Sequence, residues 1–192
     1  MTKMIRTAVA MSVATVILTA CGGGGGEGSH SGDTDPASYW TMDSHRFING
    51  GHSAVSTNSM NGVPVTTAVV STATLSGGDS SNGAYSGSAL TFAFKGAPLT
   101  GIYTVVPDRA TFMAADVSTA PILVDVTVGL ATTTGSSSQY SASSGQIHIT
   151  RDTSGNYHFA SVAPMPTRKT LDVLGGVAGA PAAMPLAIVD AY

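Results

Sequence analysis

Short runs of alternating apolar and polar residues constrain the fold of this 192-residue chain more than any other feature. The clearest run is 121–130, where every second residue from Ile122 to Leu130 is aliphatic. Successive side chains of a β-strand point to opposite faces, so this run predicts a strand with one buried face. Asp125 falls on the other face, in mid-strand. Residues 90–95 alternate in the same way and predict a second strand.

Other short apolar runs, bounded by turn residues, predict the remaining strands. They lie at 39–47, 65–75, 102–106, 146–151, 156–160, 170–174 and 185–191. The Gly96-Ala97-Pro98 segment predicts a hairpin between 90–95 and 102–106. Residues 152–155 predict a second hairpin, in which the isoleucines of 146–151 face Tyr157 and Phe159 on the core side.

The composition agrees with an all-β domain. Only 10% of the residues are charged, against about 25% in an average chain, and 23 are glycine. Serine, threonine and glycine disfavour long helices and suit strands and turns, although 110–117 could form one or two helical turns. The sequence therefore predicts an antiparallel β-sandwich or a partly closed barrel of about nine short strands, and periodicity does not choose between them.

The first 20 residues have the pattern of an export signal. Lys3 and Arg6 precede an apolar stretch at 7–18, which is too short to span a bilayer of about 30 Å. The stretch ends in Leu18-Thr19-Ala20-Cys21, an aliphatic residue and two small residues before the only cysteine. A lone cysteine also excludes an internal disulfide, so core burial and sheet hydrogen bonds must stabilise the domain.

This segment resembles the lipobox of bacterial lipoproteins, and the chain resembles the small Ser/Thr-rich lipoproteins of Gram-negative bacteria. The resemblance is specific for residues 1–26. It implies that the Cys21 thiol receives diacylglycerol, that cleavage occurs before Cys21, and that the new amino group is acylated, with palmitate as the expected label. Gly22, rather than aspartate, implies transfer to the outer membrane, with the domain facing the periplasm or the cell surface.

Three parts are therefore expected. Residues 1–20 form a signal peptide with a signal helix, 21–36 carry the lipidated cysteine and a disordered Gly/Ser tether, and 37–192 form a single β domain. Membrane lipid is the expected partner through acylated Cys21, together with an unknown protein or small molecule. Loss of Lys3 and Arg6 takes the net charge from −3 to −5, and the other basic residues are scattered, which argues against nucleic-acid binding.

No motif for a cofactor or for catalysis stands out. His148 and His158 are expected as opposite or diagonal neighbours on the outer face of the 146–160 hairpin, where two histidines could start a metal site. A third ligand is not apparent, and nearby Arg151 repels cations, so a solvated face is the expected reading. Asp43, His45 and His52 form a looser cluster that is read in the same way.

Two segments superficially resemble hydrolase motifs. Gly51-His52-Ser53-Ala54-Val55 lacks the last glycine of a nucleophile elbow, and Gly78-Asp79-Ser80 has no α/β context. Both are interpreted as polar loops. The only glutamate, Glu27, lies in the expected tether, so the sequence shows no pair of carboxylates for acid–base catalysis.

The sequence thus favours a non-catalytic binding or interaction domain held at the outer membrane. An alternative is a calycin-like carrier of a small apolar ligand. Its interior would be lined by Phe92, Phe94, Tyr157 and Phe159. A hydrolase that uses Ser53 or Ser80 is the less favoured third hypothesis.

Overall fold

A computed structural model describes residues 38–50, 52–60, 62–72, 80–97, 99–129 and 135–192. The chain divides into two units, Met1–Asp33 and Thr34–Tyr192, and every described residue belongs to the second. The predicted lipidation site at Cys21 and the predicted tether lie outside the described residues. No helix among the described residues is long and apolar enough to cross a membrane.

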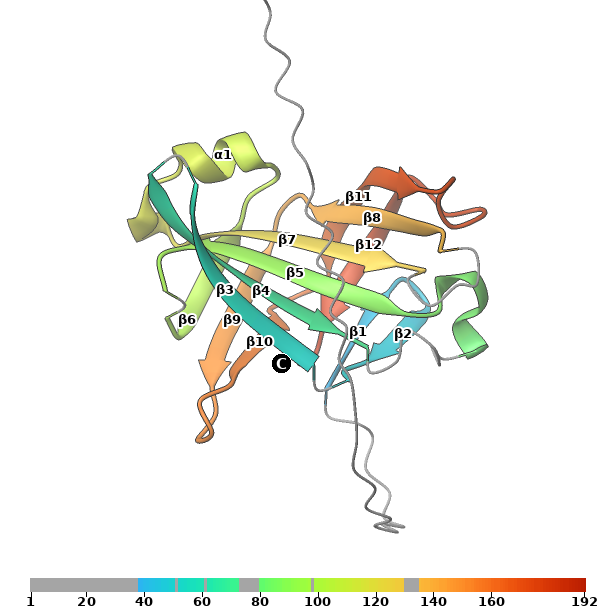
Figure 1. The fold of residues 1–192 in the computed structure, drawn as a ribbon, viewed down its shortest axis with the longest axis horizontal. Coiled ribbons are helices and arrows are strands. Elements are labelled where there is room, and N and C mark those ends of the chain that lie inside the picture. The colour runs from blue at the N-terminus through green and yellow to red at the C-terminus, as the bar shows by residue number, and fades with distance from the viewer. Residues whose placement is uncertain (1–37, 51, 61, 73–79, 98, 130–134) are drawn as a thin grey trace, which may run out of the picture. The chain divides into compact units, whose positions relative to one another are not determined.

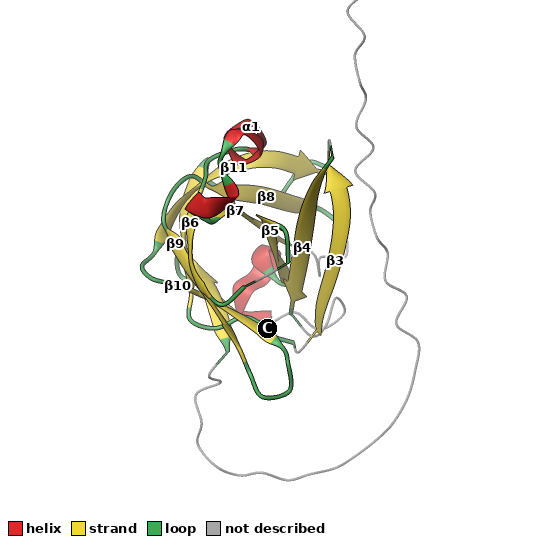
Figure 2. Ribbon diagram, turned by 90° about the vertical axis from the view of Figure 1, so that its left-hand side faces the viewer, coloured by secondary structure: helices red, strands yellow, loops and turns green. Residues whose placement is uncertain are grey.

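Twelve strands form one mostly antiparallel sheet that curls strongly (Figures 1 and 2). The strands are β1 (Tyr39–Met42), β2 (His45–Ile48), β3 (His52–Met60), β4 (Val63–Ser71), β5 (Ser88–Lys95), β6 (Gly101–Val105), β7 (Pro121–Val128), β8 (Ser137–Ala142), β9 (Gln146–Arg151), β10 (Tyr157–Ser161), β11 (Met165–Val173) and β12 (Ala183–Ile188). The helical segments are short: η1 (Ser80–Tyr85), α1 (Arg109–Ala114) and η2 (Val117–Thr119). The predicted all-β fold class is confirmed.

Strand β7 is the central strand of the sheet because three other strands pair with its two edges. One edge carries β5 over seven residue pairs, from Ser88 opposite Val128 to Phe94 opposite Ile122. The other edge is shared: β6 pairs in parallel with its first two residues, and β8 pairs with Asp125–Val128 in antiparallel fashion. A parallel pair requires a crossover, and the connection from β6 to β7 supplies it with α1 and η2.

The end of the chain closes the curled sheet into a ring. From β10 the ring runs through β9, β6, β7, β8 and β11 to β12. Beyond β12, Phe159 and Ala191 exchange two backbone hydrogen bonds, which join β10 to the C-terminal segment. The Ser161 hydroxyl accepts from the Ile188 amide and donates to the Ile188 carbonyl, so a side chain completes the ladder beside this bridge.

Two groups of strands extend the sheet beyond the ring. Strands β5, β4 and β3 continue from the second edge of β7, and β1 and β2 continue from the second edge of β12. They approach each other where the Gly50 amide donates to the Ser71 carbonyl and the Trp40 indole donates to the Ser88 hydroxyl at 3.0 Å. The layers thus share features of a sandwich and of a partly closed barrel.

The hydrophobic core lies inside the curl. The alternating aliphatic residues of β7 are fully buried there, as are Leu90, Phe92 and Phe94 of β5. The Phe92 ring stacks on Phe159 with centroids 4.1 Å apart, and Phe94 lies 6.5 Å from the same ring. These three aromatic side chains therefore pack against each other, across the space between β5 and β10.

The hairpin predicted at 146–160 is present, with Ile147, Ile149 and Phe159 inward and Tyr157 half-buried. The hairpin predicted between 90–95 and 102–106 is wrong. Strand β5 pairs with β4 and β7, whereas β6 pairs with β7 and β9. A turn-rich segment fixes where a strand ends, but not which strand its successor joins.

Two further predictions need correction. The single strand predicted at 39–47 is a hairpin, because Asp43 adopts a left-handed conformation (φ 52°) that its short polar side chain tolerates. The loop predicted around Ser53 is part of β3, and β8 was not predicted as a strand at all. Both are Ser-rich, and each is fixed by pairing with a more apolar neighbour, β4 or β7. Residues 73–75 and Leu130, predicted as strand, lie outside the described residues.

The aromatic stack across the ring should carry a large part of the stability. We expect Phe159→Ala to lower the free energy of unfolding by about 3–5 kcal/mol, because it leaves a cavity beside Phe92 and Phe94. Urea denaturation measures the change. As a control, Ile102→Ala on β6, which is 56% exposed, should cost less than about 1 kcal/mol. A Phe159→Ala cost as small as that of the control would contradict this assignment.

Candidate functional site

The structure shows a pocket of about 370 Å³ on the outer face of the sheet, opposite the aromatic core. The volume lies within the range of small-molecule sites, about 300–1,000 Å³. Its lining comes from β4, β5, β7, β8, β11, α1 and the end of β3. The lining residues are Met60, Val65, Ala93, Pro107, Asp108, Arg109, Phe112, Leu123, Val124, Asp125, Ser141, Ala142, Arg168 and Thr170.

Strand register builds the polar part of the floor. Asp125 of β7 is paired with Ser141 of β8, and Ser141 is paired in turn with Arg168 of β11. Directly paired residues point to the same face of a sheet, so these three side chains form one row across adjacent strands. Leu123 and its partner Ala93 on β5 form the neighbouring apolar row.

Asp125 is the unusual member of this row. Burial raises the pKa of its carboxyl, and the hydrogen bond donated by the Ser141 hydroxyl offsets the rise only in part. Most aspartates in the described part of the chain lie in turns or at helix ends, whereas this one sits in the middle of the central strand. A partly buried carboxyl with a raised pKa in a concave site is a frequent sign of a functional site.

One wall of the pocket is α1, which is capped at its N-terminus and bonded to the sheet at its C-terminal end. Asp108 caps the N-terminus by accepting from the Thr111 amide at 2.8 Å. Lys95 of β5 donates to the Met113 and Ala115 carbonyls at the C-terminal end. Phe112 is fully buried beneath the helix, so α1 covers the apolar side of the floor.

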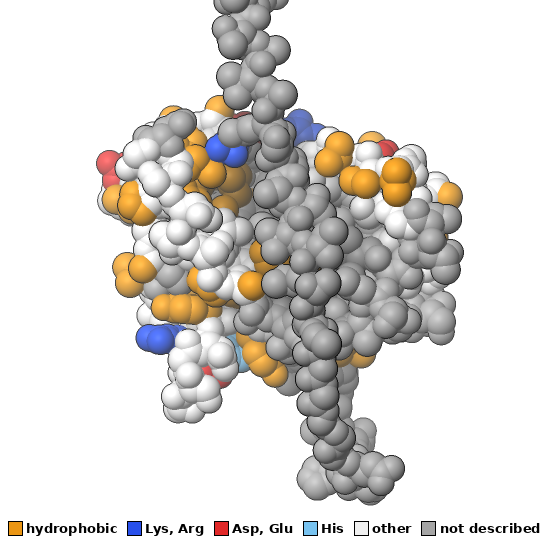
Figure 3. Space-filling model, in the orientation of Figure 1, with side chains coloured by type: hydrophobic (Ala, Val, Ile, Leu, Met, Phe, Trp, Pro, Cys, Tyr) orange, Lys and Arg blue, Asp and Glu red, His pale blue; other side chains and the backbone are white. Residues whose placement is uncertain are grey.

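Two arginines bring positive charge to the pocket. Arg109 lies on α1, Arg168 lies on β11, and both are exposed. Asp108 and Asp125 are the two acidic groups of the lining, so the arginines and aspartates are equal in number. Hydrogen bonds from Thr111 lower the pKa of Asp108, with a smaller contribution from the Arg168 charge. Figure 3 shows hydrophobic side chains gathered around Lys or Arg atoms close to α1. The site thus combines apolar walls with a few polar groups, as ligand pockets do.

No known protein family, curated protein or solved structure matches this chain. The chemistry of the pocket is therefore argued from its own residues.

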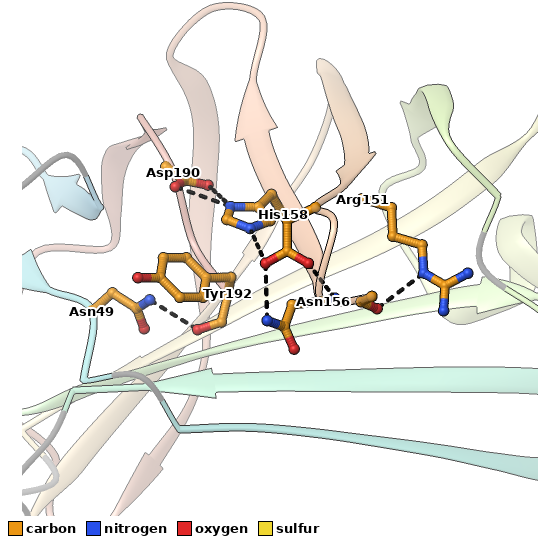
Figure 4. A network of polar contacts seen from close by, with 8 residues as sticks. Asn49, Arg151, Asn156, His158, Asp190 and Tyr192 are labelled. Atoms are coloured by element: carbon orange, nitrogen blue, oxygen red, sulfur yellow. Dashed lines mark hydrogen bonds and ion pairs between the residues drawn. The ribbon is translucent and has the colours of Figure 1, made fainter.

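A second polar cluster lies where the chain ends (Figure 4). The His158 Nδ1 atom is 3.0 and 3.1 Å from the two carboxylate oxygens of Asp190, and its Nε2 atom is 3.5 Å from Asp152 Oδ2. The Tyr192 ring stacks on the imidazole with centroids 4.4 Å apart, and Asn49 donates to the Tyr192 carbonyl. This cluster connects β10, the turn before it, the end of β2 and the C-terminal residues.

The turn between β9 and β10 presents the Asp152 carboxylate to His158. The Asn156 side chain and backbone both donate to Asp152, and the side-chain bond is the largest cause of the lowered pKa of this carboxyl. Arg151 donates to the Gly155 carbonyl and stabilises the same turn. The Nδ1 atom bonds to Asp190, whereas the buried Nε2 atom lies 3.5 Å from Asp152 without a hydrogen bond. The Nδ1 bond joins β10 to the C-terminal segment and so reinforces the closure of the ring.

The register places His148 opposite Ala160 and His158 opposite Thr150, so the two histidines are diagonal neighbours on one face. His148 is exposed, while His158 turns to the two aspartates. Among the described residues no group of three His, Cys, Asp or Glu side chains is arranged to hold a metal ion. Asp190 was missed as a partner of His158 in the sequence because it is 32 residues away, whereas Asp152 was assigned only a turn role.

The other candidate residues are not brought together in the described structure. Asp43 lies in the β1–β2 turn, and His45 stacks on Tyr85 with centroids 4.1 Å apart. The side chains of His52, Ser53 and Ser80 lie outside the description, as do Gly78 and Asp79 entirely. The pocket itself was not predicted; the mid-strand position of Asp125 was its one signal in the sequence.

Because burial raises the folded-state pKa of Asp125, its contribution to stability is complete below the ordinary aspartate pKa of about 3.8 and is lost as pH rises through the folded value. We therefore expect Asp125→Asn to be more stable than the wild type at pH 7, and the difference to vanish at acid pH. Urea denaturation over a pH series measures this. The matched control is Asp116→Asn: hydrogen bonds from Ser118 lower the pKa of Asp116, so this change should destabilise at pH 7. Equal signs for the two variants would contradict the assignment.

Removing the imidazole at the chain end should loosen the bridge between β10 and the C-terminal segment. In His158→Ala we expect the Ala191 amide, which donates to the Phe159 carbonyl, to lose about tenfold of its protection from hydrogen exchange. The exposed neighbour His148 supplies the control, since His148→Ala should leave that amide unchanged. Unchanged protection in His158→Ala would show that the cluster does not fasten the ring.

Proposed function

We propose that this chain is a lipid-anchored, non-catalytic binding module of the outer membrane, whose β domain holds a small molecule in the outer-face pocket. The observation that supports binding is the pocket itself, with its mixed lining and its half-buried Asp125. The lipobox ending at Cys21 supports the anchor, and Gly22 supports the outer membrane as its destination.

The chemistry of the pocket favours binding over catalysis. Of its two carboxyls, Asp125 is hydrogen-bonded to a serine and Asp108 caps α1, and no histidine is among the lining residues. Acid–base catalysis needs two groups with separated pKa values within reach of the substrate, and serine activation needs an adjacent base. In this pocket the Ser141 hydroxyl donates its hydrogen bond to Asp125 instead.

The packing also favours a ligand outside the sheet rather than inside it. Phe92, Phe94 and Phe159, which were expected to line the interior of a carrier, stack on one another, and Tyr157 is half-buried. None of the four lines the pocket. Binding on the outer face therefore has better support than the calycin-like carrier.

Binding in the pocket is tested with N-phenyl-1-naphthylamine, an uncharged dye whose fluorescence rises in apolar surroundings. We expect Ala93→Phe to fill the floor and abolish the fluorescence rise. Ala89→Phe is the matched control, because Ala89 lies on the same strand and face but does not line the pocket. Equal dye binding by the wild type and both variants would exclude the pocket as the binding site.

The anchor is tested by metabolic labelling with palmitate. We expect the full-length chain to incorporate the label and to fractionate with outer membranes, because two or three acyl chains hold a protein firmly to a bilayer. Cys21→Ser should lose both properties, and Ser29→Ala, in the adjacent tether, should keep them. Label incorporated by Cys21→Ser would refute the lipid anchor.

A further inference from the structure

We propose that β3 pairs in antiparallel fashion with β3 of a second copy of this chain, so that two curled sheets join edge to edge about a twofold axis at Ser56. This inference goes beyond the proposed function and depends neither on the pocket nor on the lipid anchor. It is carried by the backbone edge of β3 that faces away from β4, and by the residues that this edge presents.

Strand β3 lies at one end of the sheet. It pairs with β4 over nine residues, from His52 opposite Ser71 to Met60 opposite Val63, and no other strand of the described structure pairs with it. Figure 2 shows β3 at the border of the β5–β4–β3 group, with β4 along one side. Residues 54–59 are exposed. The second edge of β3 therefore offers backbone groups that no described strand occupies.

The hydrogen bonds of β4 show which residues of β3 direct their backbone groups to that second edge. The Gly96 amide donates to the Pro64 carbonyl, and the Thr72 amide, just after β4, donates to the Ser88 carbonyl, so both ends of β4 face β5 through even-numbered residues. Backbone groups alternate between the two edges of a strand, so the odd-numbered residues of β4 face β3. Their partners in β3 are its even-numbered residues. The residues whose amides and carbonyls point away from β4 are therefore Ser53, Val55, Thr57 and Ser59.

The spacing of these four residues lets the edge pair with itself. In an antiparallel pair centred on Ser56, Ser53 lies opposite Ser59 of the second copy, and Val55 lies opposite Thr57 of the second copy. Each of these pairs exchanges two backbone hydrogen bonds, so every outward amide and carbonyl of both strands gains a partner. Any shifted register leaves Ser53 or Ser59 opposite a residue outside β3. This match in length and register favours a second copy over an unrelated extended segment.

The composition of β3 allows two copies to approach each other. Proteins commonly protect a free edge with charged residues, proline, a bulge or a very short strand. Strand β3 contains no Lys, Arg, Asp, Glu or Pro, and its register with β4 runs without a shift. At another end of the sheet, β2 has only four residues and includes Arg46. Because a charge near a twofold axis meets its own copy, an uncharged strand is suited to pairing with itself.

Val55 adds an apolar contact to the backbone pairing. Its partner on β4, Ala68, is buried in the core, so Val55 lies on the core face of the sheet. It is nevertheless 52% exposed, because β3 has no described neighbour beyond it. A second copy would cover Val55 with Thr57, and on the outer face it would place Ser56 opposite its own copy. Small uncharged side chains therefore meet across the whole axis, and burial of Val55 favours the pair.

The register is tested by disulfide cross-linking of the full-length chain, in a Cys21→Ser background so that each variant carries one thiol. Ser56→Cys places the two thiols directly opposite each other, in a pair without backbone hydrogen bonds, where the Cα atoms are about 4.5 Å apart. Asn58→Cys is the matched control, because it is also exposed and on the same face but lies opposite Ala54 of the second copy. Mild oxidation should yield about tenfold more linked dimer from Ser56→Cys, since the Asn58 positions are too far apart for a disulfide.

Association itself is measured by analytical ultracentrifugation of the full-length protein in detergent over a concentration series. Val55→Pro removes an outward amide and leaves the bonds to β4 in place, so it should raise the dissociation constant of the dimer about tenfold. Val55→Ala keeps the amide and is the control, with an expected change below about threefold. Urea denaturation checks that Val55→Pro is folded. Ser56→Lys, which puts two like charges at the axis and leaves the backbone unchanged, should also weaken the dimer about tenfold.

Three results would overturn the inference. The first is a wild type that stays monomeric over the whole concentration series. The second is equal cross-linking of Ser56→Cys and Asn58→Cys, which would mean that the copies do not meet in this register. The third is a dimer that Ser56→Lys leaves unchanged, which would place the contact away from β3. None of these results bears on dye binding or palmitate labelling, so the proposed function is tested separately.

Discussion

The fold depends on the hydrogen bonding of β7 along both of its edges. This strand binds β5 on one side and shares the other side between β6 and β8, so three strands take their positions from it. Its inward residues lie in the core, and its outward residues form the centre of the pocket floor. One strand thus determines both the interior packing and the geometry of the candidate site.

The two faces of β7 differ in their surroundings, because one lies in the core and the other lines the pocket. Inside the curl, aliphatic and aromatic side chains pack against one another, and the Phe92–Phe159 stack spans the ring. On the outer face, Leu123 and Asp125 lie side by side on a surface that α1 covers only in part. The parallel crossover between β6 and β7 brings α1 to this surface, and the Lys95 bonds hold it there. The pocket is therefore a consequence of the connection between these two strands.

Closure of the ring is a separate requirement, met at the end of the chain. A bridge of two backbone hydrogen bonds joins Phe159 to Ala191, and the Ser161 hydroxyl extends it. The contacts of His158 with Asp152 and Asp190 lie beside this bridge and involve the last residues of the sequence. The cluster is read as structural because both imidazole nitrogens already face carboxylates.

The sequence by itself determined the all-β class, the inward face of β5, β7 and β9, and the β9–β10 hairpin, because side-chain alternation and local turn residues are encoded over a few positions. It also carries the segment Leu18-Thr19-Ala20-Cys21, which resembles a lipobox. Only the tertiary structure decided which strands β5 and β6 each pair with, the strand character of the Ser-rich β3 and β8, and the row from Asp125 to Arg168. These features depend on contacts between residues that are distant in sequence, and apolar periodicity does not report such contacts.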